Sequence, residues 1–260
     1  MDVITIMKYI KFTALCAFCL FLFACASSPT DPASMFPDKN ATALFVEGQN
    51  LMMKGSCQDA IQRFESFEAR YPFSEHAEQV LVDSIYCYNH NYDTASALAA
   101  ADRYVRLYPR GKYIAYAYYM RGLINFEQNR GFIERHVNID FSKRDLTSFQ
   151  ASFNDFNQVV SYFPTSDYAY DARLRMIYLR NLFARHELQI AQYEYDRDQY
   201  VAAANRANDI VRHYQQTPSI PEALAIMVKS YRQVGATKAA DDAYKILKLN
   251  FPDSAAFKSL

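Results

Sequence analysis

Five segments of the chain share one spacing of small and apolar residues, and this repetition constrains the fold more than any other feature. Each segment ends in an aromatic residue, and in four of them proline follows directly. Counting back from the aromatic, the other positions lie at intervals of 4, 3 and 4, which trace one face of an α-helix. Proline cannot continue a helix, so it marks the end of each one. The five sets are Ala60, Phe64, Phe67, Tyr71; Ala97, Ala101, Tyr104, Tyr108; Ser152, Phe156, Val159, Phe163; Ala203, Ala207, Ile210, Tyr214; and Ala240, Tyr244, Leu247, Phe251.

The spacing between these segments indicates a helical repeat. The aromatic ends fall at positions 71, 108, 163, 214 and 251, so successive copies are 37, 55, 51 and 37 residues apart. A unit of about 34 residues with this pattern is typical of the tetratricopeptide (TPR) helix–turn–helix. We therefore predict an all-α TPR superhelix of five repeats, about ten helices, over residues 41–260. The repeats lie near 41–72, 73–109, 110–164, 165–217 and 218–252, and their stacking creates a concave groove suited to binding peptide segments.

The two long steps predict additions to the repeat. Residues 129–144 lie between the helices of the third repeat and lack clear periodicity. The first helix of the fourth repeat runs from about residue 167 to 197, with a possible kink near His186. The other first helices are expected near 42–54, 74–89, 113–128 and 221–234, with Gly48 and Leu51 at typical TPR positions.

Composition agrees with a helical chain and excludes several function classes. Only 6 glycines occur in 260 residues, which is about a third of average usage. Nucleotide-binding folds with glycine-rich loops and β-sandwiches with many tight turns are therefore disfavoured. The chain carries 28 basic and 28 acidic residues, whereas a nucleic-acid-binding protein needs a basic surface.

The N-terminus has the pattern of a bacterial lipoprotein signal. Basic residues precede an apolar run at 12–24, which is shorter than the about 20 residues that span a membrane. The run ends in Leu22-Phe23-Ala24-Cys25, which resembles the lipobox. We expect a signal peptide at 1–24, a lipid on Cys25, and a proline-bearing tether at 25–40. Ala26, rather than aspartate, favours the outer membrane; an ordinary signal peptide with an incidental cysteine is the alternative.

Candidate chemistry is sparse. The sequence has no zinc-protease, nucleophile-elbow or phosphate-loop motif, and the five histidines lack metal-ligand spacing. Asp140 and Asp145 are interpreted as helix caps or as ion-pair partners of Arg144 or Lys143, in preference to acid–base catalysts. We predict a protein that is not an enzyme and that uses no metal and no cofactor.

Cys57 and Cys87 fall on the same edge of a TPR stack. In an oxidising compartment a disulfide between them is one interpretation. The preferred interpretation is two small, partly buried thiols, and the sequence leaves the choice open.

Several stretches resemble the BamD family, lipoproteins of the β-barrel assembly machinery. They are Arg70-Tyr-Pro-Phe73, Asp102-Arg-Tyr-Val-Arg-Leu-Tyr-Pro109, Tyr119-Met-Arg-Gly-Leu123, Arg144-Asp145 and Ala204-Asn-Arg206. The resemblance implies a scaffold anchored by lipid to the periplasmic face of the outer membrane. Its partners would be the POTRA domains of a BamA-type barrel protein, other BAM lipoproteins and unfolded outer-membrane proteins, with no nucleic acid.

The resemblance also implies site residues. Arg206, beside Asn205, would face a carboxylate of the last POTRA domain. Tyr71 and Arg103 would read the C-terminal signal strand of substrates, which ends in aromatic residues and a carboxylate. The repeat pattern also places Tyr71 on the core-facing stripe, so a packing role competes.

Two other functions remain open at this point. A TPR lipoprotein could instead organise peptidoglycan or cell-division proteins. The residues inserted in the third repeat could also carry a hydrolase site, which would make the chain an enzyme.

Overall fold

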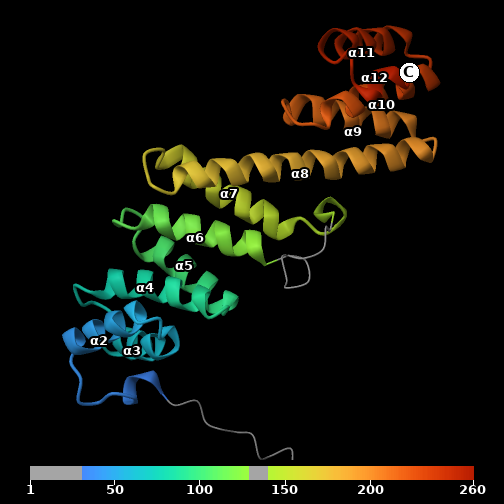
Figure 1. Ribbon diagram of the computed structural model, residues 1–260. Coiled ribbons are helices and arrows are strands. Elements are labelled where there is room, and N and C mark those ends of the chain that lie inside the picture. The colour runs from blue at the N-terminus through green and yellow to red at the C-terminus, as the bar shows by residue number, and fades with distance from the viewer. Residues whose placement is uncertain (1–30, 129–139) are drawn as a thin grey trace, which may run out of the picture.

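The computed structural model describes residues 31–128 and 140–260, and in these ranges the chain is helical, with no strand. Five antiparallel helix pairs stack along one axis (Figure 1). Cys25 and the signal segment, as well as residues 129–139, lie outside the described residues. The predicted all-α TPR superhelix is confirmed. The pairs are α2 (Ala41–Met53) with α3 (Cys57–Arg70), α4 (Ala77–His90) with α5 (Thr94–Leu107), α6 (Ile114–Glu127) with α7 (Thr147–Tyr162), α8 (Ala169–Asp196) with α9 (Tyr200–His213), and α10 (Ile220–Gln233) with α11 (Thr237–Asn250).

The repeated spacing describes the second helix of every pair. In each set the first and third positions are 0–2% exposed, and in four of the five sets the second position is fully buried too. The fourth position, the aromatic residue, is half-buried and caps the helix: its backbone N–H donates to the carbonyl four residues back at 2.7–2.9 Å. Each aromatic residue therefore lies at the end of its helix and of the buried stripe. The turn that follows leads to the next helix pair.

Two glycines allow the helices of a pair to approach closely. A Cβ added to Gly48 of α2 would lie under 3.0 Å from the ring of Phe64, and one added to Gly122 of α6 would lie 2.9 Å from the ring of Phe156. Both phenylalanines occupy the second position of the repeated set. The glycine and the aromatic ring are thus complementary parts of the same contact.

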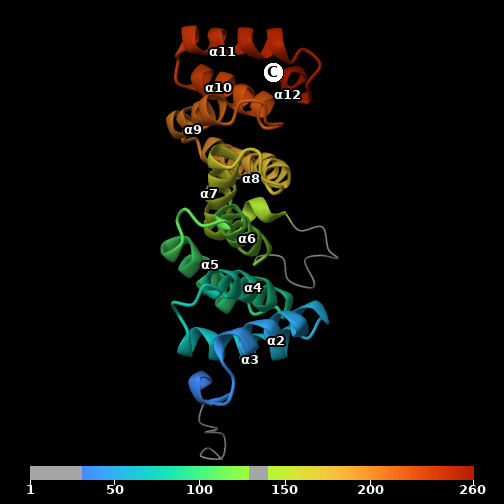
Figure 2. The ribbon, with the colours of Figure 1, turned by 90° about the vertical axis from the view of Figure 1, so that its left-hand side faces the viewer.

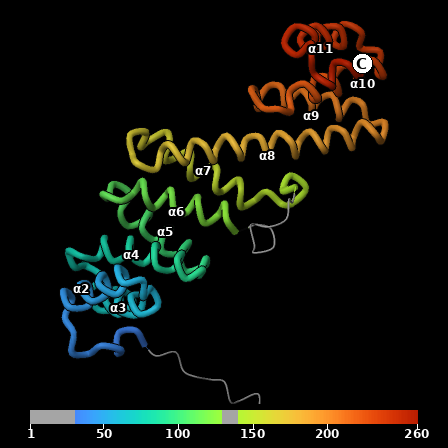
Figure 3. The backbone as a smooth tube through the Cα atoms, viewed as in Figure 1, coloured from blue at the N-terminus to red at the C-terminus, as the bar shows by residue number. Residues whose placement is uncertain are grey.

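The first helix of the fourth pair differs from the others. With 28 residues, α8 has twice the 14 residues of α4, α6 and α10. It packs on α7 over its first half and on α9 and α10 over its second half (Figures 1 and 3). It passes through His186 as one helix, so the suggested kink is wrong. Seen from the side, the helix pairs are stacked at changing angles (Figure 2).

Cys57 and Cys87 form a disulfide, with Cα atoms 5.0 Å apart. Cys57 begins α3 and Cys87 lies in the last turn of α4, and both are at least 98% buried. The preferred interpretation as two separate thiols is therefore wrong. The bond joins the first repeat to the second.

A buried ionic network ties the second repeat to the third. Arg121 of α6 donates to both carboxylate oxygens of Asp155 on α7 and to Asp102 on α5. The Asp155 side chain is 6% exposed, whereas that of Asp102 is 44% exposed. Burial raises the pKa of Asp155, and the bonds from Arg121 oppose this shift. The stretch Tyr119-Met-Arg-Gly-Leu123 thus supplies two structural contacts, through Arg121 and Gly122.

Candidate functional site

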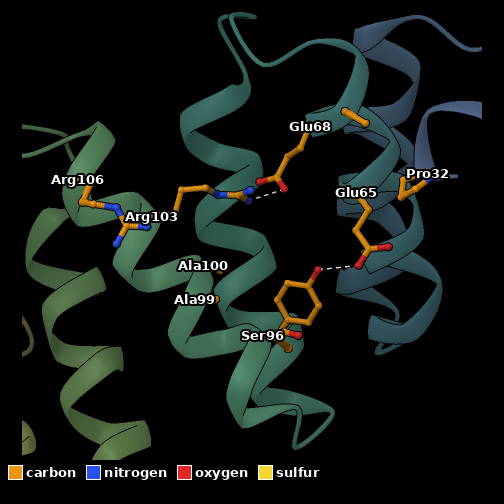
Figure 4. A pocket seen from close by; sticks show the side chains of 10 residues that line it. Pro32, Glu65, Glu68, Ser96, Ala99, Ala100, Arg103 and Arg106 are labelled. Atoms are coloured by element: carbon orange, nitrogen blue, oxygen red, sulfur yellow. Dashed lines mark hydrogen bonds and ion pairs between the residues drawn. The ribbon is translucent and has the colours of Figure 1, made fainter. Parts of the chain in front are cut away.

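Arg103 lies on the wall of a cavity of about 610 Å³ in the N-terminal half. The cavity is bounded by α3, α4 and α5 and by Pro32 of the short 3₁₀ helix η1 (Pro32–Ser34) (Figure 4). Its lining combines acids, arginines, one tyrosine and small side chains. The residues are Pro32, Glu65, Glu68, Ala69, Tyr88, Ser96, Ala99, Ala100, Arg103 and Arg106.

Two hydrogen bonds within the cavity lining join α3 to the neighbouring helices α5 and α4. Arg103 donates to Glu68 of α3 at 2.5 Å, and the Tyr88 hydroxyl donates to Glu65 at 2.7 Å (Figure 4). The Arg103 side chain remains 43% exposed. Burial raises the pKa of Glu68, although the charge of Arg103 opposes the shift. Burial and the bond to Glu65 raise the pKa of Tyr88, so its phenol stays protonated and can donate.

The structure does not bring Tyr71 into this cavity. Tyr71 caps α3, packs tilted on Phe67, and donates its hydroxyl to the Lys39 carbonyl at 3.3 Å. Arg70 donates to the Tyr71 hydroxyl and to the carbonyl of Phe36. Tyr71 therefore holds the segment before α2 against α3. The aromatic ring that lines the cavity with Arg103 belongs instead to Tyr88, which the sequence pattern did not single out because it lies outside the repeated sets.

Arg206 is engaged within its own chain. It donates to Glu187 at 2.6 Å and to Glu194 at 3.2 and 3.3 Å, and both acids lie on α8. These contacts raise the pKa of Arg206, with the bond to Glu194 as the largest cause. Its side chain is 34% exposed, so it lies at the surface with a local excess of one negative charge. The neighbouring Asn205 is exposed on α9.

Asp140 caps a short helix, as expected, whereas Asp145 precedes the cap residue of α7, Leu146, and bonds to the first residue of that helix. Asp140 accepts from the backbone N–H and hydroxyl of Ser142 in the 3₁₀ helix η2 (Phe141–Lys143). Asp145 accepts from the N–H and hydroxyl of Thr147 at the start of α7. The ion-pair partner of Asp140 is Arg185 of α8, at 3.0 Å. This long-range partner replaces the sequence neighbours Lys143 and Arg144 that the interpretation had named for Asp140.

The end of the inserted segment is fixed to the middle of α8. His186 donates from Nδ1 to the Ser142 carbonyl at 2.6 Å, and Gln189 donates to both Asp140 and the Ser142 hydroxyl. These polar contacts join the segment at 140–143 to α8. Within 31–128 and 140–260, no group of three or more histidine, cysteine or acidic side chains is arranged to hold a metal ion. None of the helices in these ranges combines the length and apolar character needed to cross a bilayer.

Comparison with known proteins identifies the family. A family model described as outer membrane lipoprotein, YfiO, matches residues 37–246. Proteins named outer membrane protein assembly factor BamD are similar over nearly the whole chain. The one from Vibrio cholerae is 36% identical and the alignment covers 94% of this chain and 99% of its own. That from Neisseria meningitidis serogroup B is 35% identical, covering 92% and 90%, and that from Haemophilus influenzae is 32% identical, covering 94% and 92%.

A solved tetratricopeptide repeat protein from Parabacteroides merdae is 16% identical, covering 88% of this chain and 84% of its own with a TM-score of 0.40. This likeness is too low to carry any statement about function. The family model and the curated relatives, in contrast, extend across all five helix pairs. The chain therefore belongs to the YfiO family of outer membrane lipoproteins, the family of the assembly factors named BamD.

Proposed function

We propose that this protein is a non-enzymatic assembly factor for outer-membrane β-barrel proteins. The observation that carries the proposal is its similarity, along nearly the whole chain, to relatives named for that role. Cys25 carries the lipid, and the folded repeats lie on the periplasmic face of the outer membrane. The repeats act as a scaffold that meets a BamA-type barrel protein, other BAM lipoproteins and unfolded substrates.

The cavity at Arg103 is the proposed substrate site. A C-terminal signal strand presents aromatic rings and a terminal carboxylate, and Arg is the side chain best suited to pair with a carboxylate. Tyr88, Ala99 and Ala100 provide the apolar wall. Because Glu68 already pairs with Arg103, the incoming carboxylate replaces Glu68 at the guanidinium. Tyr71 contributes indirectly, by fixing the segment that leads to Pro32.

The barrel subunit is proposed to dock on its POTRA domains at the surface around Arg206 and Asn205. A POTRA carboxylate there competes with Glu187 and Glu194 for Arg206. Until then these two acids fix the position of the Arg206 guanidinium. Loss of a hydrogen-bonded interfacial charge typically costs about 2–5 kcal/mol.

Affinity capture from membranes tests this proposal. The native chain is expected to recover the barrel protein, and Arg206→Glu is expected to release it while circular dichroism still shows the helical fold. Lys245→Glu, on the exposed surface of α11, is the matched control and keeps the complex. Recovery of peptidoglycan or cell-division proteins without a barrel protein would reject the proposal in favour of the alternative scaffold.

A second capture addresses the cavity. Arg103→Ala is expected to weaken crosslinking to a peptide that carries the C-terminal signal, without releasing the barrel protein. The same peptide with an amidated C-terminus serves as the control, since it lacks the charge that Arg103 would pair with. Equal crosslinking of both peptides would exclude carboxylate recognition at this site.

A further inference from the structure

One face of α8 is covered in its second half and open in its first half. In the second half, Ala184, Leu188 and Ala191 belong to the core that α8 shares with α9 and α10. The residues two heptads earlier on the same face are Tyr170, Leu174 and Ile177. Their exposed fractions are 70%, 49% and 55%. An apolar stripe that continues a packed interface is therefore left exposed for about half the length of the helix.

Charged residues follow the edge of the same stripe at intervals of seven. The four positions are Arg173, Arg180, Glu187 and Glu194, which share one side of the helix. In the covered half, the two acids pair with Arg206 of α9. In the open half the charges are reversed. Arg173 is exposed and has no ion pair among the described residues, and Arg180 donates to the carbonyl of His213 and to Gln215.

The surroundings define the shape of this open surface. The end of α9 approaches α8 at Arg180, through the bond to the His213 carbonyl at 3.1 Å. Beyond this point α9, α10, α11 and the short α12 (Ala255–Lys258) lie on one side of the other half of α8 (Figure 1). On that side no described helix covers the first half of α8, because α7 packs on the opposite side. The uncovered part, Ala169 to about Leu182, equals the 14 residues of α9 in length. The space that is open next to α8 thus matches one more helix of the repeat.

We propose that the first half of α8 is a docking surface for an amphipathic helix of a partner protein. Its apolar face packs on Tyr170, Leu174 and Ile177, and acidic residues along its edge pair with Arg173 and Arg180. The charges on α8 favour this partner. In the covered half, acidic residues of α8 pair with an arginine of α9, so the arginines in the open half favour acidic residues on the partner helix. The inference is independent of the docking at Arg206, which lies over the second half of α8.

Two designed 18-residue helical peptides provide the probes. Both carry leucine at intervals of 4 and 3 on one face, and they differ only in having glutamate or lysine along its edges. Fluorescence anisotropy with the full mature chain is expected to show about tenfold tighter binding of the acidic peptide. Arg173→Glu together with Arg180→Glu is expected to reverse this preference, and Leu174→Glu with Ile177→Glu is expected to abolish binding of both peptides.

Val201→Glu is the matched control, since Val201 is 62% exposed on α9 outside this surface, and it should leave binding unchanged. Thermal melting establishes that each variant is folded. In cells, a photocrosslinking residue at position 177 is expected to capture an acidic amphipathic helix of another protein. Equal binding of the two peptides, no binding, or capture of a second copy of this chain or of lipid would overturn the proposal.

Discussion

The N-terminal and C-terminal halves of the molecule use the same second helix but differ in the first. In the N-terminal half, α2, α4 and α6 have 13 or 14 residues, so each pair covers its neighbour along its length. In the C-terminal half, α8 has 28 residues and is shared by α7 on one half and by α9 and α10 on the other. The length of the first helix thus decides how consecutive repeats are arranged. With a short first helix they stack directly, and with the long α8 they pack on different halves of the same helix.

The two candidate arginines reflect this difference. Arg103 has one glutamate partner and borders a cavity lined by residues of α3, α4 and α5 and by Pro32. Arg206 has two glutamate partners on the long α8, so its guanidinium is held over a continuous helix surface. Both arginines lie on the second helix of a pair, but their surroundings differ. Arg103 is placed to meet a ligand inside a cavity, and Arg206 is placed to meet the surface of another protein.

The largest effect is expected in the ionic network around Arg121 in the third repeat. Asp155→Ala removes the main partner of Arg121 and leaves a partly buried cation, which typically costs about 3–5 kcal/mol. Chemical denaturation would measure the loss. Asp102→Ala, which removes the more exposed contact of the same arginine, is the control and should cost about 1 kcal/mol or less. Equal losses for both variants would show that the buried Asp155 stabilises the fold no more than the exposed Asp102.

The disulfide is expected to stabilise only the N-terminal half. Cys57→Ala with Cys87→Ala opens a loop of 30 residues in sequence separation and should cost about 2–4 kcal/mol. Hydrogen exchange should then rise in α2 to α5 and stay unchanged in α9 to α11, because stacked repeats contact only their neighbours. Non-reducing mass spectrometry of the native chain checks the bond itself, and two free thiols would contradict it.

Glycine substitutions compare the packing of the first and third repeats. Gly48→Ala places a methyl group closer to its phenylalanine ring than Gly122→Ala does, so it should be the more destabilising change. Overpacking typically costs about 1–3 kcal/mol, and the gain in helix propensity offsets about 1 kcal/mol in both variants. Thermal unfolding measures the order. A larger loss for Gly122→Ala would indicate that the first repeat is the more tolerant one.

The smallest effect concerns a buried carboxylate in the N-terminal half. Asp83 is 5% exposed and accepts from Gln49 and Gln79, and burial raises its pKa. A raised pKa in the folded state means that protonation favours folding, so this contribution to stability grows as pH falls from neutrality towards the ordinary aspartate range. The free energy of unfolding of the native chain, relative to that of Asp83→Asn, should therefore increase as the pH falls from 7 to 4.

Asp145→Asn is the matched control for this measurement. Hydrogen bonds from the side chain and backbone of Thr147 lower the pKa of Asp145. Its stabilising contribution is present at neutral pH and is lost as the pH falls below the ordinary aspartate range. The native chain should therefore lose its advantage over Asp145→Asn under acid, the opposite direction to Asp83. The same direction for both variants would contradict the assigned pKa shifts.

Sequence periodicity predicted the helices well because burial of one helix face requires a fixed spacing. The positions 4, 3 and 4 apart, from Ala60 to Tyr71 and in the other four copies, form the packed stripe of each second helix. The candidate site was predicted only in part. Arg103 could be selected by its family context, but Tyr88 and Glu68 come from other helices, and their approach depends on how α3, α4 and α5 stack.

By itself, then, the sequence determined the fold class, the ends of the second helices and the places where helices approach closely, because these follow from local spacing and from proline. Only the tertiary structure decided that Cys57 meets Cys87, that Arg206 pairs with Glu187 and Glu194, and that half of one face of α8 stays open. Such contacts join residues on different helices. They depend on how the helices stack on one another, which no local pattern encodes.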